Sequence, residues 1–370
     1  MTTPSVRFVK LILLTLLTGL NPTIVFSQSI EISEKAIDDF SLGYTKIIGF
    51  TESGYFILSA NNGYDVSGER VGFKSPKYKL GFVGKDLKLA WEKPVESRGE
   101  NGIVRMVTFL NEKAMVLTST WSKSTSKLTF SAFCIDEKGD LRGEWNTLSE
   151  IEFKKEPLYF GSSTSLRKER FMIYAAAEVE SGMQLSVLVF NKEMEIATRT
   201  EEMVRQPTRN FSIEQCAVSD SGKAILLGLR TEKQKALSSK RDNTWYAYTF
   251  SNNQITEMPL GRGRDVTYLN LVIDEFRNEA VLTGFYSDKE SFVGAGILHG
   301  RMKLEGDTTI LSQYISIDAS QNLRLKGARN NGESGGLATF PVRKTIPRGD
   351  GGVAIIAESA YTTEYSYFDS

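Results

Sequence analysis

The sequence predicts an all-β protein: a β-propeller of about six four-stranded blades, whose last blade is incomplete or is closed by the amino-terminal strand. Three observations predict this fold. Short apolar runs of β type recur along the chain at nearly constant spacing, hairpin patterns accompany them, and no convincing amphipathic helix occurs after residue 27.

The recurring runs, called anchor runs below, begin at glycine or charged turn residues and end in a small residue. They are GYFILSA at Gly54, KAMVLTS at Lys113, RFMIYAA at Arg170, KAILLGL at Lys223, EAVLTGF at Glu279 and GVAIIAE at Gly352. Their small positions are Ser59, Thr118, Ala175, Gly228, Gly284 and Ala357, spaced 59, 57, 53, 56 and 73 residues apart. Because the innermost strands of a propeller are covered on both faces, we expect the anchor runs to be innermost, with their small residues crowded near the axis.

Hairpin patterns follow four of the anchor runs. They span Tyr78–Glu92, Leu128–Trp145, Leu185–Arg199 and Trp245–Met258. With the strand before each anchor run, such as GIVRMVTFL, each period holds four strands. A period of 53 to 59 residues is slightly longer than the roughly 40–50 of WD40 and kelch blades. A pair of β-sandwiches needs no regular period and a β-helix needs a much shorter one, so both alternatives fit less well.

We therefore predict one domain after a cleaved leader. The leader covers residues 1–27 and the propeller covers residues 28–370. Its blades lie near 40–96, 102–150, 157–204, 211–260, 265–315 and 337–370.

The amino terminus has the pattern of a secretory signal peptide. Arg7 and Lys10 precede an apolar run, Leu11–Leu20, and Val25 and Ser27 supply small residues before a cleavage site at Gln28. The run is shorter than the ~20 residues of a membrane span, and none like it follows. We expect a secreted, periplasmic or cell-surface protein without an integral membrane segment.

Composition excludes several functions. Lys plus Arg equals Asp plus Glu at 45 each, so no net field attracts nucleic acid, and we expect no nucleic-acid partner. His299 is the one histidine, and Cys134 and Cys216 are the two cysteines, so the usual multi-histidine metal sites cannot be assembled. We expect no metal and no cofactor. A disulfide between the cysteines stays open, although single core thiols fit their spacing better.

Three short motifs are best explained as turns. Asp136–Glu144 is rich in oxygen ligands but lacks EF-hand spacing. Gly261–Asp265 contains G-x-G without a following helix to present to phosphate. Arg348–Asp350 matches the RGD tripeptide that integrins recognise, but it leads into a glycine pair at a bend.

Side chains at predicted loops offer further candidates. Carboxylates for a glycosidase come from Asp38, Asp39, Glu180, Asp265 and Asp288, most of which we interpret as solvated surface charge. Aromatic platforms for a sugar or peptide come from Tyr64, Trp121 and Tyr286, for which packing within or at the edge of the core is the simpler explanation. No catalytic residue is identified.

The closing segment, Ile346–Ser370, resembles the iP-x-x-DGG-x-x-x-iAE segment of secreted bacterial β-propeller proteins of no assigned activity. The anchor runs and their hairpins carry the same resemblance over residues 28–370. It implies architecture, and it transfers no catalytic residues.

Two function classes remain. The first is a non-catalytic interaction propeller that binds protein or glycan outside the inner membrane. The alternative is a carbohydrate-active or other hydrolase with carboxylates about 5–10 Å apart at the propeller axis. We favour the first, because every specific catalytic signature is missing.

The last repeat leaves two alternatives for closure of the propeller. In the first alternative, Gln28–Ala36 pairs beside Glu364–Ser370 and completes the last blade. In the second, the chain is a truncated form of a longer relative. We favour truncation, because Ser370 falls within a hairpin pattern.

Overall fold

The computed structural model describes residues 44–60, 78–99, 101–180, 182–206, 210–233, 241–251, 254–261, 264–287, 294–305, 310–316 and 342–357. All of them belong to one compact unit, Ser41–Ser370. They form strands and turns, and within these ranges no helix is long and apolar enough to cross a membrane.

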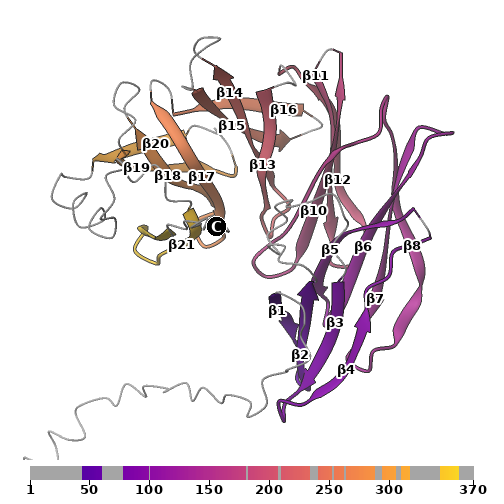
Figure 1. The fold of residues 1–370 in the computed structure, drawn as a ribbon. Helices are drawn as coiled ribbons and strands as arrows, with labels where there is room; N and C mark the ends of the chain where they lie inside the picture. Colours follow the sequence, from indigo (N-terminus) through magenta and orange to yellow (C-terminus); the bar gives the residue numbers. More distant parts are fainter. Residues whose placement is uncertain are drawn as a thin grey trace, which may run out of the picture. The chain divides into compact units, whose positions relative to one another are not determined.

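The strands form five four-stranded antiparallel sheets and one two-stranded sheet, each built from consecutive strands (Figure 1). The first sheet contains β1 (Tyr44–Phe50), β2 (Gly54–Ala60), β3 (Tyr78–Gly84) and β4 (Leu89–Pro94). The second contains β5 (Ile103–Leu110), β6 (Lys113–Ser122), β7 (Lys127–Ile135) and β8 (Leu141–Glu152). The third contains β9 (Tyr159–Thr164), β10 (Arg170–Val179), β11 (Gly182–Asn191) and β12 (Ile196–Val204).

The remaining sheets follow the same order. The fourth contains β13 (Phe211–Val218), β14 (Ala224–Lys233), β15 (Arg241–Ser251) and β16 (Gln254–Leu260). The fifth contains β17 (Asp265–Asp274), β18 (Glu279–Ser287), β19 (Gly294–Lys303) and β20 (Ile310–Ser316). The last hairpin is β21 (Val342–Pro347) and β22 (Val353–Ala357).

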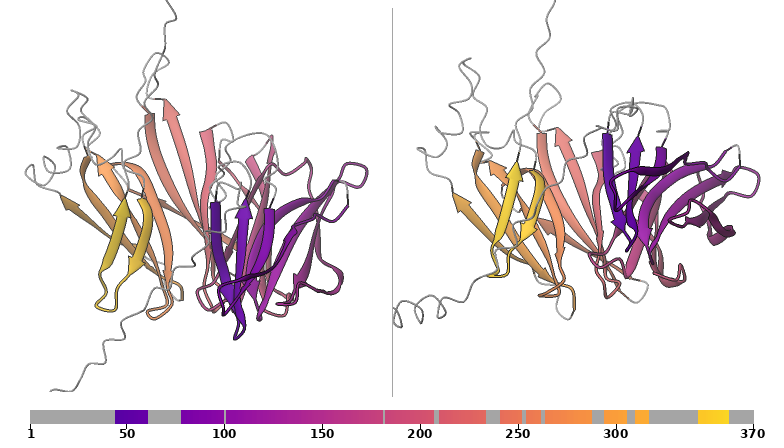
Figure 2. Two further views of the ribbon diagram at one scale, coloured as in Figure 1. Left: turned by 60° about the horizontal axis from the view of Figure 1, so that its bottom comes forward. Right: turned by 90° about the horizontal axis from the view of Figure 1, so that it is seen from below.

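These sheets are the blades of a β-propeller, as predicted. The first strand of each blade contacts the first strand of the next, from β1 through β5, β9, β13 and β17 to β21. Both views of Figure 2 place the last hairpin, in yellow, beside the strands of the fifth blade, in orange. The first strands are therefore the innermost strands, and the fourth strands are the outermost.

The prediction that the anchor runs are innermost is wrong. They form β2, β6, β10, β14, β18 and β22, the second strand of each blade. Their continuous apolar character has a different cause, visible in β10. Met172 and Tyr174 face the fourth blade, whereas Phe171 and Ile173 face the second. A strand covered by a blade on each side needs apolar residues at every position.

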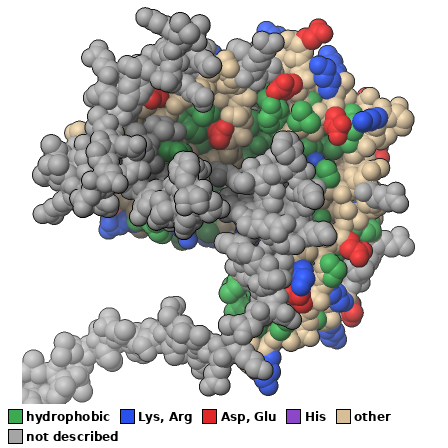
Figure 3. Space-filling model, viewed as in Figure 1, with side chains coloured by type: hydrophobic (Ala, Val, Ile, Leu, Met, Phe, Trp, Pro, Cys, Tyr) green, Lys and Arg blue, Asp and Glu red, His purple; other side chains and the backbone are tan. Residues whose placement is uncertain are grey.

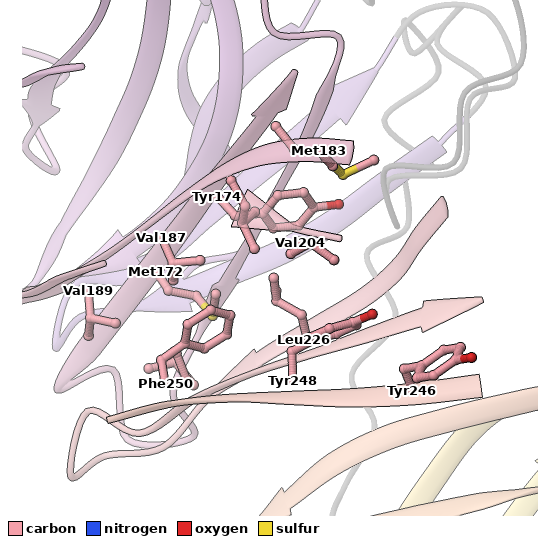
Figure 4. Close-up of a cluster of buried hydrophobic side chains, with 14 of the residues drawn as sticks. Met172, Tyr174, Met183, Val187, Val189, Val204, Leu226, Tyr246, Tyr248 and Phe250 are labelled. Carbon is pink, nitrogen blue, oxygen red and sulfur yellow. The ribbon is translucent and has the colours of Figure 1, made fainter. Parts of the chain in front are cut away.

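Apolar clusters join successive blades. One cluster joins the first and second blades, one the second and third, one the third and fourth, and one the fourth and fifth. In the third–fourth cluster, side chains of β10 and β11 meet those of β14 and β15 (Figure 4). Each large buried side chain contributes roughly 1.5–3 kcal/mol to stability.

The first strands share an irregularity: a β-bulge. One extra residue interrupts the pairing of β1, β5, β13, β17 and β21 with the second strand, at Ile48, Arg105, Glu214, Thr267 and Arg343 respectively. The pairing of β9 with β10 has no such shift. A bulge places two residues opposite one and so changes which face the following side chains occupy.

The bulge of β13 shows this change of face. Phe211 and Ile213 precede Glu214, and Cys216 and Val218 follow it. All four side chains pack into the third–fourth cluster, although the two before the bulge have odd residue numbers and the two after it have even ones. A strict alternation pattern therefore breaks in the middle of the strand.

The two predictions about closure of the propeller concern Gln28–Ala36 and Glu364–Ser370, which lie outside the described residues. The predicted leader, residues 1–27, also lies outside them.

Candidate functional site

A groove of about 350 Å³ lies between the outer strands of the third and fourth blades. The residues that line it, and that define the Tyr248 groove, are Glu202, Met203, Val204, Arg205, Tyr248, Gln254, Ile255 and Glu257. They come from the end of β12, from the middle of β15 and from β16. Over the region of β11 to β16, Figure 3 shows acidic, basic and hydrophobic side chains intermingled at the surface.

Tyr248 connects the groove with the core. Its ring packs in the third–fourth cluster near Leu226 and Val204, and its hydroxyl points out of the cluster (Figure 4). The side chain is 1% exposed, and its hydroxyl lies beside the Glu257 carboxylate and the Gln206 amide without good hydrogen-bond geometry to either. Burial raises the pKa of Tyr248, and the nearby Glu257 carboxylate raises it further. The phenol is therefore neutral at ordinary pH and offers one donor and two acceptor positions.

A chain of hydrogen bonds orients the carboxylate beside Tyr248. The amide Nε2 of Gln206 donates to Oε1 of Glu257 at 2.9 Å, and Nη1 of Arg230 donates to Oε1 of Gln206 at 3.4 Å. The Arg230 guanidinium also lies 5.6 Å from the centre of the Tyr246 ring. Gln206 is buried, so its amide is held between the cation and the carboxylate, and Glu257 is fixed in place.

Local packing explains why Tyr248 takes this position. Gly228 lies on β14, the neighbour of β15. A Cβ atom on Gly228 would lie 2.5 Å from the Phe211 ring and 2.9 Å from the Tyr248 ring. The two rings meet edge to face at 6.0 Å between centroids. The missing side chain therefore makes the space in which these rings pack.

The groove has the chemistry of a binding site for a polyhydroxylated ligand. Tyr248 and the amide of Gln254 offer both donors and acceptors, the carboxylates of Glu202 and Glu257 accept, and Arg205 donates. Val204, Met203 and Ile255 supply an apolar surface. Its volume is at the lower end of the ~300–1,000 Å³ typical of ligand pockets, which suits a short ligand.

His299 lies within a blade and away from the groove. It belongs to β19, where it pairs with Thr283 of β18 and Gln313 of β20. Burial lowers its pKa, and the positive charge of Arg301 lowers it further. Among the described residues, no Ser or Cys is hydrogen-bonded to it as a nucleophile.

Cys134 and Cys216 are free thiols. They lie on β7 of the second blade and β13 of the fourth. Burial raises the pKa of both, that of Cys216 to about 12, so neither is an activated thiolate. Within the described ranges, no three His, Cys, Asp or Glu side chains gather as a metal site.

Two of the three short motifs, Asp136–Glu144 and Arg348–Asp350, contain turns, as predicted. Oδ1 of Asp136 accepts hydrogen bonds from the backbone amides of Lys138 and Asp140, each at 3.0 Å, in the hairpin between β7 and β8. Its carboxylate therefore closes a turn. In the Gly261–Asp265 motif, the Arg264 amide donates to the Gly261 carbonyl at 3.0 Å, and the two residues between them lie outside the described residues.

The Arg348–Asp350 tripeptide forms the turn between β21 and β22, and the fifth blade holds it. Arg277 donates from Nη1 to the Arg348 carbonyl at 3.1 Å and from Nη2 to the Gly349 carbonyl at 2.5 Å. Within the tripeptide, Nη2 of Arg348 lies 2.7 Å from Oδ2 of Asp350. The two charges that an integrin would bind are paired with each other.

The two candidate loop carboxylates that the structure describes lie in different blades. Glu180 is exposed beyond the end of β10, and Asp265 is buried at the start of β17. Asp38, Asp39 and Asp288 lie outside the described residues.

The candidate aromatic platforms pack against the core where the structure describes them. Trp121 packs against the second–third cluster. Tyr286 is 2% exposed and meets Tyr314 edge to face, with the Arg264 guanidinium 4.5 Å from its ring centre. Tyr64 lies outside the described residues.

Sequence reasoning missed the groove residues. Glu202, Arg205 and Glu257 are ordinary charged residues of hairpin strands, and nothing in their spacing marks them. The one signal in the sequence was Gly228, the small residue of an anchor run, which is followed on the next strand by three aromatic residues, Trp245, Tyr246 and Tyr248. That signal indicates crowded aromatic packing, but it does not indicate a groove.

Comparison with known proteins gives structural similarity only. No protein-family model matches the sequence, and no curated protein matches it. Similar solved structures include a protein from Lactobacillus plantarum, with 12% identity over 71% of this chain and 68% of that chain and a TM-score of 0.36. The Dos1 propeller is 10% identical, and the match covers 71% of this chain and 57% of that chain with a TM-score of 0.40. An ulvan lyase is 11% identical, and the match covers 77% of this chain and 81% of that chain with a TM-score of 0.34. Identities this low bear on the fold alone.

Proposed function

We propose that this protein is a non-catalytic binding propeller, exported from the cytoplasm, that holds a short glycan in the Tyr248 groove. The observation that carries the proposal is the Tyr248 hydroxyl, buried without a well-formed hydrogen bond at the wall of the groove. The hydroxyl has only poorly oriented contacts with Glu257 and Gln206, so a ligand hydroxyl in the groove can offer it a better hydrogen-bond partner.

The rest of the groove supports a saccharide as the ligand. Gln206 holds the Glu257 carboxylate in a fixed orientation, which reduces the ordering cost of binding. The apolar side chains of Val204, Met203 and Ile255 suit the C–H faces of a sugar ring. Export rests on the predicted signal peptide alone.

Binding is tested with a glycan array. The protein is expressed from Gln28 onward as wild type, as Tyr248→Phe and as Tyr174→Phe. Tyr174 is a suitable control because it is a buried tyrosine of the same cluster that does not line the groove. We expect the wild type and Tyr174→Phe to retain the same glycans, and Tyr248→Phe to lose about tenfold or more in affinity. Equal affinity of all three proteins would contradict the proposal.

A hydrolase is the alternative, and one observation favours it. Glu202 and Glu257 bring two carboxylates into the same groove from two blades. They lie on outer strands and not at the axis, where the sequence-based alternative places its carboxylates. Incubation of the wild type with a panel of chromogenic glycosides separates the two functions. Release of chromophore that is lost in Glu202→Gln and in Glu257→Gln would establish the hydrolase.

A further inference from the structure

The charges of the Tyr248 groove point to one class of glycan. Glu202 and Glu257 both line the groove, and in the described part of the chain no cation forms an ion pair with either carboxylate. Glu201, the neighbour of Glu202 on the same strand, is by contrast paired with Arg199, whose Nε lies 2.5 Å from Oε1 of Glu201. The two carboxylates of the groove therefore carry negative charge that no described ion pair neutralises.

The one cation among the lining residues, Arg205, offsets only part of this charge. Arg205 lines the groove, and no ion pair joins it to a described carboxylate. Arg230 lies behind Gln206, because its Nη1 donates to Oε1 of Gln206, and it is not among the lining residues. A ligand carboxylate or sulfate would meet two like charges and one opposite charge, which is unfavourable on balance.

We propose that the glycan bound in the Tyr248 groove carries a free primary amine, and that the ligand is a short oligosaccharide of an unacetylated amino sugar. This proposal rests on the proposed function. An ammonium group has three donors and no acceptor. The groove supplies an acceptor for each of these three donors: the carboxylates of Glu257 and Glu202 and the hydroxyl oxygen of Tyr248. The two hydrogen bonds to carboxylates are charge-assisted.

A lysine-bearing peptide offers the same ammonium group, but the edges of the groove disfavour an extended chain. Such a peptide would gain its affinity by adding as a strand to the free edge of an outer strand. Pro259 interrupts the backbone donors of β16, and the exposed Glu201 and Glu202 put charge on β12. Proline and charged residues are the usual means by which edge strands avoid such pairing. The ring hydroxyls of a sugar find partners instead in Gln254 and Arg205.

Isothermal titration of the protein from Gln28 onward tests the ligand class. The probes are a β-1,4-linked glucosamine trimer, its fully N-acetylated form, a glucuronic-acid oligosaccharide and a lysine-rich peptide. We expect the glucosamine trimer to bind about tenfold or more tightly than the acetylated trimer, because acetylation removes the charge and two donors. We expect the glucuronic-acid probe not to bind.

Variants locate the effect in the groove. Glu257→Gln and Glu202→Gln are expected to weaken binding of the glucosamine trimer by about tenfold and binding of the acetylated trimer by less, so that the preference for the free amine falls. Glu201→Gln is the matched control, since Glu201 is paired with Arg199 and does not line the groove, and it is expected to leave both affinities unchanged.

The outcomes separate this inference from the proposed function. If both trimers bind equally and Tyr248→Phe abolishes binding, the glycan site stands and the requirement for an amine is wrong. If the lysine peptide alone binds, the ligand class is wrong, and if no saccharide binds, the proposed function fails together with this inference.

Discussion

At the scale of single residues, the structure assigns different roles to buried polar groups that look alike in the sequence. Asp136 is buried and uses its carboxylate to close a turn. Gln206 is buried and uses both ends of its amide. Tyr248 is buried as deeply, and its hydroxyl lacks a well-formed hydrogen bond. Of these three residues, only Tyr248 lines the groove, and this position makes it the candidate for contact with a ligand.

Tyr248→Phe is expected to stabilise the free protein. The substitution removes a buried hydroxyl whose contacts with Glu257 and Gln206 lack good hydrogen-bond geometry, so the free energy of unfolding should rise by up to about 1 kcal/mol, whereas most core substitutions lower it. Urea denaturation of wild type and variant without ligand measures the change. A loss of stability comparable to that of other core substitutions would show that the hydroxyl has a structural partner.

His299 is expected to make stability depend on pH. Burial lowers its pKa below the ordinary 6.5, so between these two values the unfolded chain binds a proton that the folded chain does not. Stability is then complete above about pH 6.5 and falls as the pH drops toward the folded-state pKa. The Tm of His299→Gln, measured between about pH 5 and pH 8, should fall less steeply than that of the wild type. Parallel curves for the two proteins would argue against this account.

At the scale of the strands, periodicity predicted the elements but not their places within a blade. The anchor runs are strands, and the hairpins after them are hairpins. Continuous apolar character, however, marks any strand that is covered on both faces, and in this protein that is the second strand, so the sequence could not distinguish it from the first. The bulges obscured the first strands further, because an extra residue breaks their alternation.

Gly228, the small residue of the fourth anchor run, makes room for side chains of the two neighbouring strands. Gly228→Ala is expected to destabilise the protein by about 1–3 kcal/mol, because the new methyl group would collide with the rings of Phe211 and Tyr248. Thermal unfolding measures the loss. Gly349→Ala is the matched control, since no atom lies within 4 Å of the position that its new methyl group would occupy, and it should change stability little.

At the scale of the whole molecule, regular spacing was sufficient to predict the propeller, because each blade repeats one supersecondary unit. The groove was beyond sequence reasoning for a related reason. It forms where the outer strands of two blades meet, from residues 202–205 and 248–257, and a repeat pattern contains no information on the gap between two repeats.

The shared clusters predict cooperative unfolding. Each of the second, third and fourth blades contributes side chains to two clusters, so no one of these blades can unfold without exposing part of the next. Trp91 packs against the first–second cluster and Trp245 lies in the fourth–fifth. Variants that retain one or the other as their single tryptophan should show coincident denaturation midpoints. Separate midpoints would mean that the two parts of the chain unfold independently.

The bulges of the first strands also determine which single-residue deletions the fold tolerates. Deletion of Glu214 would convert β13 into a regular strand and would keep Phe211, Ile213 and the shortened remainder on their present faces. Deletion of one residue within β9, which has no bulge, would turn every following side chain to the opposite face. We expect the first deletion to yield soluble protein and the second to abolish folding, a contrast that expression of the two variants measures directly.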